Sequence, residues 1–222
     1  MAGEIMVVRC GTVPYAEAWE LQRRLQAQRQ REEIGDVLLL LEHPPVYTRG
    51  RRSKPEELPM GAEWYEAQGI EVLDTDRGGL VTYHGPGQLV AYPIVQLRGY
   101  GGDVHEYVRG LERTMTGALA EAGVRAGVIE GLTGVWVGTR KIGSIGLHVS
   151  RGVTTHGLAV NVNNDLQPFE WVVPCGIEGV AMTSLSRELG AEQDMAAFAD
   201  TLVAAYARVF DKEPVAAGNV PA

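Results

Sequence analysis

Three stretches of the chain repeat apolar residues at the spacing of an α-helix. Residues 103–122 carry them at intervals of four, three, four and four, at Val104, Val108, Leu111, Met115 and Leu119. Residues 194–210 have a similar stripe, at Met195, Phe198, Leu202, Tyr206 and Val209. A third helix is expected from Pro14 to about Glu33, with its apolar face at Ala18, Leu21 and Leu25. Each pattern places one side of a helix against a core.

Shorter runs with β-strand character lie between these helices. Strands are expected at residues 5–10, 37–41, 69–97 (strand, turn, strand), 133–137, 141–149 and 155–163. Val37–Leu41 is apolar throughout, which is typical of a strand buried on both faces. Leu89–Leu97 has the same character, although Pro93 indicates an edge position or a bulge.

Helices and strands neither alternate strictly nor separate completely along the chain. This order predicts an α+β (mixed α/β) fold, with a mixed β-sheet flanked by helices. No internal repeat or linker divides the chain, so we expect a single domain over residues 1–213 and a frayed tail at 214–222. Residues 44–62 hold four prolines and a basic run, and this predicts a long loop.

Composition narrows the class of protein. The 222 residues are 45% apolar and 22% charged, with a net charge of −8, which argues against a nucleic-acid binder. No apolar run reaches the ~20 residues of a membrane-spanning helix, and the first ten residues lack the pattern of a signal peptide. We therefore expect a cytoplasmic protein that does not act at a membrane. Its two cysteines, Cys10 and Cys175, should be free thiols there.

Glycine is concentrated in segments that also hold reactive side chains. These segments are residues 77–88, 138–146 and 154–159. None has the spacing of a dinucleotide or phosphate loop. The set His84, His148, His156 and Cys175 has no metal-binding spacing, and no nucleophile elbow is present. We expect no metal and no cofactor.

Two glycine-rich features suggest a ligand slot and a reactive thiol. In a strand over residues 155–163, Gly157, Ala159 and Asn161 share one small-sided face, which could line a slot or pack against a helix. Cys175 lies between Pro174 and Gly176, a pair that presents a side chain at a turn. From spacing alone it is either a nucleophile, activated by a cation such as Lys141, or a small packed hydrophobe.

Several motifs in order resemble the lipoyl(octanoyl) transferase family. They are Arg77-Gly-Gly-x-x-x-Tyr-His-Gly-Pro-Gly-Gln88, Gly134-Val-Trp136, Lys141-Ile-Gly-Ser-Ile-Gly146, Thr155-His-Gly-Leu-Ala159, Asn161-Val162 and Pro174-Cys-Gly176, with a weaker match at residues 42–48. The likeness covers roughly residues 35–190. It implies the fold of biotin and lipoate protein ligases, with a second, smaller sheet.

The resemblance also implies an activity and a site. An acyltransferase of this kind moves an octanoyl group from octanoyl-acyl carrier protein to a lysine of a lipoyl domain, through a thioester on the enzyme and without ATP. Acceptors would be the lipoyl domains of 2-oxoacid dehydrogenase complexes and the glycine cleavage H protein. By position, Cys175 is the nucleophile and Lys141 its activator. The acyl site would comprise Arg77, Gly78, Gly79, Leu80, Val81, Thr82, Tyr83, His84, Ser144, Ile145, Gly146, Gly157, Leu158 and Ala159.

Other functions on the same fold remain as alternatives. An ATP-dependent lipoate or biotin ligase does not require a nucleophilic cysteine, so Pro174-Cys175-Gly176 favours the transferase. An amidotransferase between carrier proteins uses cysteine as well, and the placement of Lys141 and of residues 77–88 disfavours it. A non-catalytic docking module would not need both Lys141 and Cys175.

One basic run stands out in an acidic chain. Four positive charges fall within six residues, at Arg49, Arg51, Arg52 and Lys54. This run is either a solvated loop or a surface that steers acidic carrier proteins toward the site.

Overall fold

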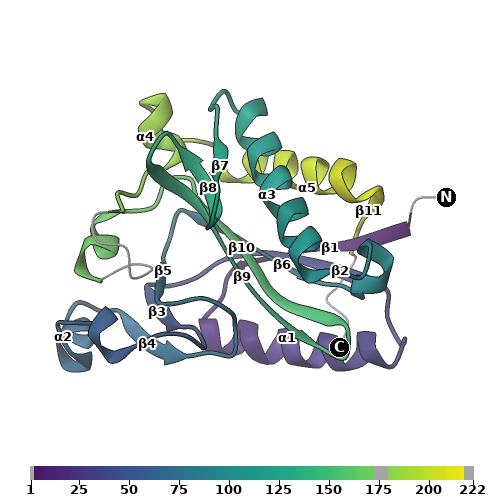
Figure 1. Cartoon of the computed structure of the whole chain (residues 1–222), viewed down its shortest axis with the longest axis horizontal. Coiled ribbons are helices and arrows are strands. Elements are labelled where there is room, and N and C mark those ends of the chain that lie inside the picture. The colour runs from purple at the N-terminus through teal and green to yellow at the C-terminus, as the bar shows by residue number, and fades with distance from the viewer. Residues whose placement is uncertain (1–2, 173–179, 218–222) are drawn as a thin grey trace.

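The computed structural model describes residues 3–172 and 180–217, and Cys175 therefore lies outside the described residues. Within these ranges the larger sheet has the order β11–β1–β2–β6–β10–β9–β8–β7 (Figure 1). Its strands are β1 Gly3–Thr12, β2 Asp36–Glu42, β6 Gln88–Ile94, β7 Gly127–Ile129, β8 Leu132–Val137, β9 Arg140–Ser150, β10 Val153–Asn161 and β11 Lys212–Ala216. A smaller sheet has the order β4–β3–β5, with β3 Val46–Arg49, β4 Glu71–Asp74 and β5 Thr82–His84. The expected mixed sheet with a smaller second sheet is confirmed.

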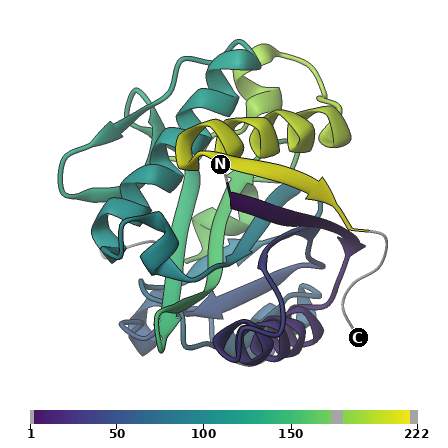
Figure 2. The same cartoon turned by 90° about the vertical axis from the view of Figure 1, so that its right-hand side faces the viewer.

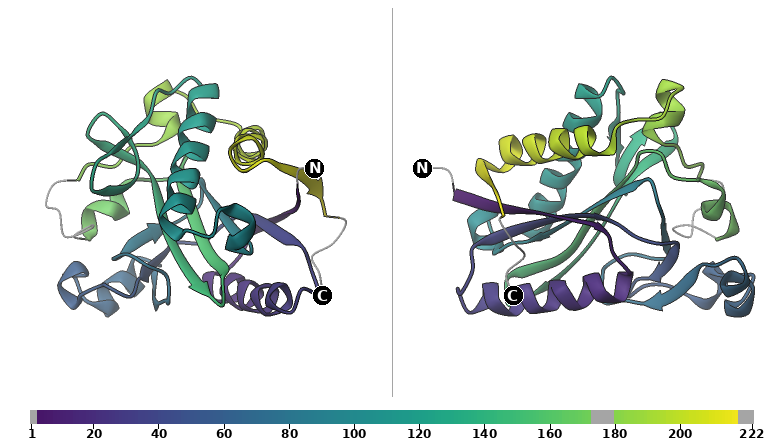
Figure 3. Two further views of the ribbon diagram at one scale, coloured as in Figure 1. Left: turned by 45° about the vertical axis from the view of Figure 1, so that its right-hand side comes forward. Right: turned by 180° about the vertical axis from the view of Figure 1, so that it is seen from behind.

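Helices cover both faces of the larger sheet, and the short helix over residues 62–67 packs against the smaller sheet instead (Figures 1 and 3). They are α1 Tyr15–Gln30, α2 Ala62–Ala67, α3 Val104–Glu121, α4 Leu185–Leu189 and α5 Met195–Phe210, with 3₁₀ turns η1 Pro55–Glu57, η2 Leu97–Tyr100 and η3 Gln167–Trp171. The three long helices agree with the apolar periodicities within a few residues. Asp103 and Asp194 cap α3 and α5 by accepting backbone N–H bonds.

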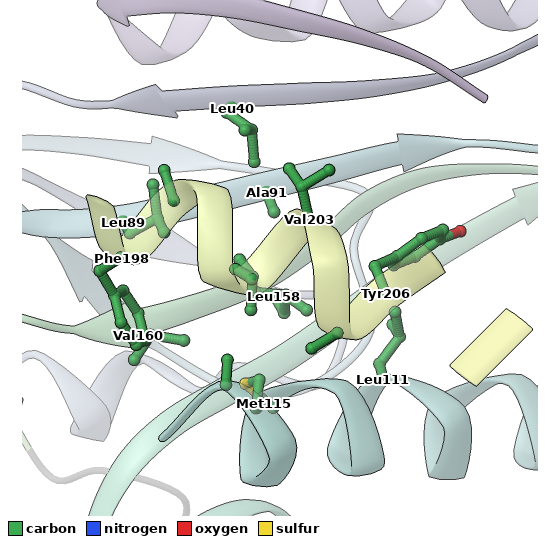
Figure 4. Close-up of a cluster of buried hydrophobic side chains, with 14 of the residues drawn as sticks. Leu40, Leu89, Ala91, Leu111, Met115, Leu158, Val160, Phe198, Val203 and Tyr206 are labelled. Carbon is green, nitrogen blue, oxygen red and sulfur yellow. The ribbon is translucent and has the colours of Figure 1, made fainter. Parts of the chain in front are cut away.

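The two faces of β2 divide the core into two parts. Leu38 and Leu40 point to the side of α3 and α5, whereas Val37, Leu39 and Leu41 point to the side of α1. This is the two-residue alternation of a strand covered on both faces. Figure 4 shows Phe198, Val203 and Tyr206 of α5 lying over strand side chains such as Leu158 and Val160. The smaller sheet has its own cluster around Tyr47, Tyr65 and Phe169.

Helix α1 is held on the sheet by glutamines as well as by its apolar side. Gln22 accepts the backbone N–H of His156 through Oε1 at 2.6 Å. Gln26 and Gln30 donate to the carbonyls of Val153 and Ser150 at 2.8 and 2.9 Å. These hydrogen bonds hold the helix against the β9–β10 hairpin, where the sequence indicated only a narrow apolar face.

Three sequence expectations need correction. Residues 44–62 are not one loop, because β3 and η1 form within them; Val46, Tyr47 and Thr48 are good strand formers. Pro93 lies on an interior strand, in register with Leu38 of β2 and beyond the stretch of β6 that pairs with β10. Of the tail expected to be frayed from residue 214, residues 214–216 belong to β11, which pairs in parallel with β1 (Figure 2).

Two glycines of α3 provide a matched test of the packing between α3 and α5. A Cβ on Gly110 would overlap the Phe210 ring, whereas a Cβ on Gly117 would make an ordinary 3.8 Å contact with Ala205. Gly110→Ala should therefore lower the free energy of unfolding by about 1–3 kcal/mol through overpacking. Gly117→Ala should raise it by roughly 0.5–1 kcal/mol, because alanine favours helix interiors. Urea denaturation of both variants tests this, and equal effects would contradict the packing described.

Candidate active site

A cavity of about 430 Å³ lies between the smaller sheet and strands β8–β10 of the larger one. It collects residues that are far apart in the sequence. Thirteen of the fourteen expected acyl-site residues line it, as does Lys141: Arg77, Gly78, Gly79, Leu80, Val81, Thr82, His84, Ser144, Ile145, Gly146, Gly157, Leu158 and Ala159. The sequence motifs thus converge on one cavity.

Tyr83 is the expected residue that does not line this cavity. Successive residues of β5 face opposite sides, so Thr82 and His84 face the cavity and Tyr83 faces away. Its ring packs instead against Tyr47 and Phe169, with centroids 5.4 Å apart in each pair. Tyr83 therefore belongs to the core of the smaller sheet.

The Arg77–Gly79 segment crosses β9 at backbone contact distance. The N–H of Gly78 donates to the carbonyl of Leu147 at 2.8 Å. A Cβ on Gly146 would lie only 3.0 Å from the Gly78 carbonyl oxygen. Glycine at position 146 is needed because a side chain would push this cavity wall away from the strand.

Arg77 holds that segment to the smaller sheet. Its side chain is buried and donates to both the carbonyl and the hydroxyl of Thr48, at 2.5 and 2.8 Å from Nη2. A Cβ on Gly50 would lie 2.5 Å from the Gly79 carbonyl oxygen, so these two segments also touch. The guanidinium therefore acts mainly as an internal brace for the cavity wall.

Lys141 is buried at the start of β9, with 7% of its surface exposed. Its Nζ lies 5.3 Å from the centroid of the Trp136 ring on β8, a cation–π geometry. Its backbone N–H donates to Ala181, and its carbonyl accepts from Thr183, both at 2.9 Å. The strand that carries Lys141 is thus fixed to the segment that follows Cys175 in the sequence.

The two described residues that flank the segment containing Cys175 pack in the same place. Val172 and Val180 both belong to the cluster around Tyr47 and Tyr65, together with Met182. Met182 in turn bridges to Lys141. The described chain that follows residue 179 therefore runs beside Lys141.

Cys10 has a different environment. Its side chain is half-buried on β1, among the residues that pack with α1, and it does not line the cavity. Burial raises the pKa of the Cys10 thiol above its ordinary value. A thiol of this kind is a poor nucleophile at neutral pH.

A group of buried polar rings lines or underlies the cavity. Tyr15, His84, Tyr92 and His156 line it, and His43 lies directly behind them. His156 has φ of 56° in the middle of β10, a conformation that non-glycine residues rarely adopt. Sequence analysis identified only His84 among these rings as a site residue. His43 and His156 fall within the motifs at residues 42–48 and 155–159 without having been assigned to the acyl site, whereas Tyr15 and Tyr92 lie in none of the motifs.

Hydrogen bonds fix how these rings are protonated. His43 donates from Nδ1 to the Val13 carbonyl at 2.7 Å, so its Nε2 accepts from the Tyr92 hydroxyl at 2.8 Å. His156 donates from Nε2 to the Asp76 carboxylate at 2.7 Å, and Tyr15 is 3.1 Å from Nδ1. Burial lowers the pKa of His43 to about 4 and lowers the pKa of His156 as well. The imidazole rings of His43 and His156 are therefore uncharged at neutral pH.

One buried hydrogen-bond donor at the cavity and the absence of a metal-binding cluster in the described residues indicate what the site could bind. The Trp136 Nε1–H is buried and has no hydrogen-bond partner within residues 3–172 and 180–217, so it is a candidate donor to a bound molecule. Among residues 3–172 and 180–217, no group of three or more His, Cys, Asp or Glu could hold a metal ion. No helix in those ranges is long and apolar enough to cross a membrane.

Comparison with solved structures defines the class of protein. The chain superposes on a putative lipoate protein ligase of T. acidophilum with a TM-score of 0.74, at 15% identity, over 98% of this chain and 88% of that one. It matches a lipoate-protein ligase A bound with ATP with a TM-score of 0.72, at 13% identity, over 99% and 91% of the two chains. Biotin protein ligase from Aquifex aeolicus gives 0.54, at 12% identity, over 95% and 70%. The fold is that of lipoate and biotin protein ligases.

Sequence relatives identify the family. Residues 14–207 match the model of the lipoyl protein ligase A/B catalytic domain. The chain is 50% identical over 214 residues to an octanoyltransferase of Chloroflexus aggregans, covering 95% of this chain and 97% of that one. An octanoyltransferase of Rubrobacter xylanophilus is 48% identical over 201 residues, 90% of each chain. The chain belongs to the lipoyl protein ligase A/B catalytic domain family, among its octanoyltransferases.

The buried histidines predict a pH dependence of stability. A histidine whose pKa is lowered by folding binds fewer protons folded than unfolded, so stability falls as pH drops below about 6.5. His43 alone, with a folded pKa of about 4, should cost about 2 kcal/mol between pH 7 and pH 5. Urea denaturation at both values measures the loss, and imidazole NMR at pH 5.5 should find His43 neutral. Equal stability at pH 7 and pH 5, or a protonated His43, would contradict the assignment.

Proposed function

We propose that this octanoyltransferase takes its acyl group from octanoyl-acyl carrier protein and delivers it to the lysine of a lipoyl domain, through a thioester on Cys175. The observation that carries the proposal is the cavity that joins Lys141 to the glycine-rich walls of β9, β10 and residues 77–82. The relatives named octanoyltransferases support the acyl group. The carrier-protein donor, the lipoyl-domain acceptor and the Cys175 thioester are proposed here.

In the first step, the Cys175 thiolate attacks the carbonyl carbon of the donor thioester. A new C–S bond forms to Cys175, the bond to the carrier's sulfur breaks, and the carrier leaves as a thiol with a proton from the Lys141 ammonium. A cation beside a cysteine favours the thiolate, so Lys141 serves both purposes. The Trp136 N–H is a donor suited to the negative charge that develops on the carbonyl oxygen.

In the second step, the amine of the acceptor lysine attacks the enzyme thioester. A C–N bond forms, the C–S bond to Cys175 breaks, and Lys141 recovers a proton from the incoming amine. An acyl thioester is already activated, so no ATP is consumed. Octanoyl transfer in the absence of ATP separates this function from that of the ligases with the same fold. An amidotransferase would instead require an octanoylated protein amide as donor.

The acyl chain fits the apolar part of the cavity. Leu80, Val81, Ile145 and Leu158 offer apolar surface along its lining. Burying an aliphatic chain stabilises the complex by about 0.8 kcal/mol per methylene. A nucleophilic thiol also requires reducing conditions, which supports the cytoplasm as the compartment.

The basic run is connected to this cavity. The backbone N–H groups of Arg51 and Arg52 donate to the carbonyls of Arg77 and Gly79, at 3.0 and 3.1 Å. Arg49 pairs with Asp74 at 2.8 Å, whereas Arg51, Arg52 and Lys54 are exposed and Arg52 also lines the cavity. Carrier proteins are acidic, so we propose this loop as their docking surface.

The covalent step is tested by mass spectrometry. Octanoyl-acyl carrier protein should add one octanoyl group to the enzyme, and hydroxylamine should remove it. Cys175→Ser should lose nearly all turnover, because an alcohol is a far weaker nucleophile than a thiolate at neutral pH. Cys10→Ala is the matched control and should keep full turnover, since Cys10 lies outside the cavity. An adduct that persists in Cys175→Ala would rule out the proposed intermediate.

The docking surface is tested by charge reversal. Arg51→Glu with Lys54→Glu should raise KM for octanoyl-acyl carrier protein several-fold at low salt and leave kcat nearly unchanged, because steering acts on association. Arg52 is kept because it lines the cavity. Arg24→Glu with Arg125→Glu gives the same change in net charge at exposed positions outside the loop and should have little effect. Both double variants should use octanoyl-pantetheine equally well. A similar KM for both with the carrier protein would exclude the loop as the docking surface.

A further inference from the structure

One buried carboxylate lies beside the cavity without lining it. Glu112 projects from α3 and is 2% exposed. Its Oε1 accepts the backbone N–H of Gly134 on β8 at 3.0 Å, and its Oε2 accepts from Arg109 Nη1 at 2.8 Å. Burying a carboxylate costs free energy unless its hydrogen bonds are satisfied. An apolar residue could join this helix to the strand at a lower cost, so a glutamate here suggests a role beyond packing.

The residue that Glu112 binds is in direct contact with Lys141. Gly134 has φ of 122°, which L side chains rarely adopt. A Cβ there would lie 2.8 Å from Cε of Lys141, 3.3 Å from its Nζ and 2.5 Å from the Gly143 carbonyl oxygen. The end of the lysine side chain therefore lies across the open face of Gly134, with the Trp136 ring nearby.

The backbone conformation of Gly134 has to be stabilised by its surroundings. Glycine populates positive and negative φ about equally, so nothing in Gly134 itself keeps the strand in this conformation. The pairing of β8 with β9 is also irregular between Val135 and Trp136, immediately after it. The hydrogen bond that the Gly134 N–H donates to Glu112 fixes this peptide next to the point where the β8–β9 ladder is interrupted.

We propose that Glu112 is a positioning residue for Lys141 and acts through the backbone of Gly134. The proposal rests on the proposed role of Lys141 in acyl transfer. In this arrangement, the length of the Glu112 side chain determines where the Gly134 peptide lies, and the peptide determines where the Lys141 ammonium can sit. The negative charge of Glu112 is directed to Arg109 on the exposed side of the helix.

Two variants of Glu112 separate length from charge. Glu112→Gln keeps an acceptor oxygen at the same reach and removes the charge, whereas Glu112→Asp keeps the charge and shortens the reach by one methylene. We expect the Glu112→Gln variant to keep kcat within about twofold. The Glu112→Asp variant should lower kcat by about 10- to 100-fold with little change in KM, because misplacing a catalytic group by about 1 Å can lower the rate ~10²-fold. A Cys10→Ala background leaves Cys175 as the thiol that iodoacetamide can alkylate. In that background, the pH profile of the alkylation rate should shift to higher pH in Glu112→Asp and should not shift in Glu112→Gln.

Lys141→Ala and Arg109→Ala are the reference variants. If Lys141→Ala changes neither kcat nor the alkylation profile, the proposed role of Lys141 fails. If it changes both while Glu112→Asp changes neither, the positioning role of Glu112 is overturned and the role of Lys141 stands. Arg109→Ala should keep kcat and the alkylation profile, because it does not touch Gly134, although it should lower stability by leaving the buried Glu112 carboxylate without its charge partner.

Thermal unfolding separates positioning from simple support of the fold. A merely structural role would lower the melting temperature of both Glu112 variants and leave the alkylation profile unshifted, and this result would overturn the proposal. Gly134→Ala gives a second route if Glu112→Asp does not fold. It leaves Glu112 in place, displaces the Lys141 side chain, and should reproduce the loss of kcat and the shifted profile. An unshifted profile in Gly134→Ala would also overturn the proposal.

Discussion

The contact on which the rest of the site depends is the crossing of residues 77–79 over β9. At Gly78 and Gly146 two backbones approach closely enough to hydrogen-bond, with no side chain between them. This contact joins the smaller sheet to the larger one and closes one wall of the cavity. Arg77 reinforces it by binding Thr48 on β3. A Cβ would crowd the opposite backbone at both glycines, at 3.0 Å for Gly146 and 3.3 Å for Gly78, so this contact favours glycine at both positions.

A second constraint is the polar interior beneath an apolar ligand site. Gln22, Asp76 and Tyr15 hold His156 in a strained backbone conformation, and the strain is offset by hydrogen bonds at its backbone nitrogen and at both ring nitrogens. Burial keeps the neighbouring imidazoles neutral. The cavity is thus closed by rigid, uncharged rings, which are compatible with a neutral acyl chain.

The Lys141 ammonium group lies in a site that is largely shielded from solvent. Lys141 is held at its backbone by residues 181 and 183, and at its side chain by Gly134 and Trp136. Such restraint matters because acid–base catalysis requires a proton donor in a fixed position. The basic loop is tied by backbone hydrogen bonds to residues 77 and 79, so a partner bound there would contact a wall of the cavity that we propose for the acyl chain.

The sequence by itself determined the long helices, most of the strands and the glycine-rich motifs, because periodicity and backbone freedom are local properties. It also brought Lys141 and the segments around Gly78, Ser144 and Gly157 together by resemblance. It did not determine that Tyr83 faces away, that residues 46–49 form a strand, or that Tyr15, Tyr92, His156 and Glu112 surround the site. Those facts depend on strand parity, on sheet edges and on burial, which exist only once distant segments have packed.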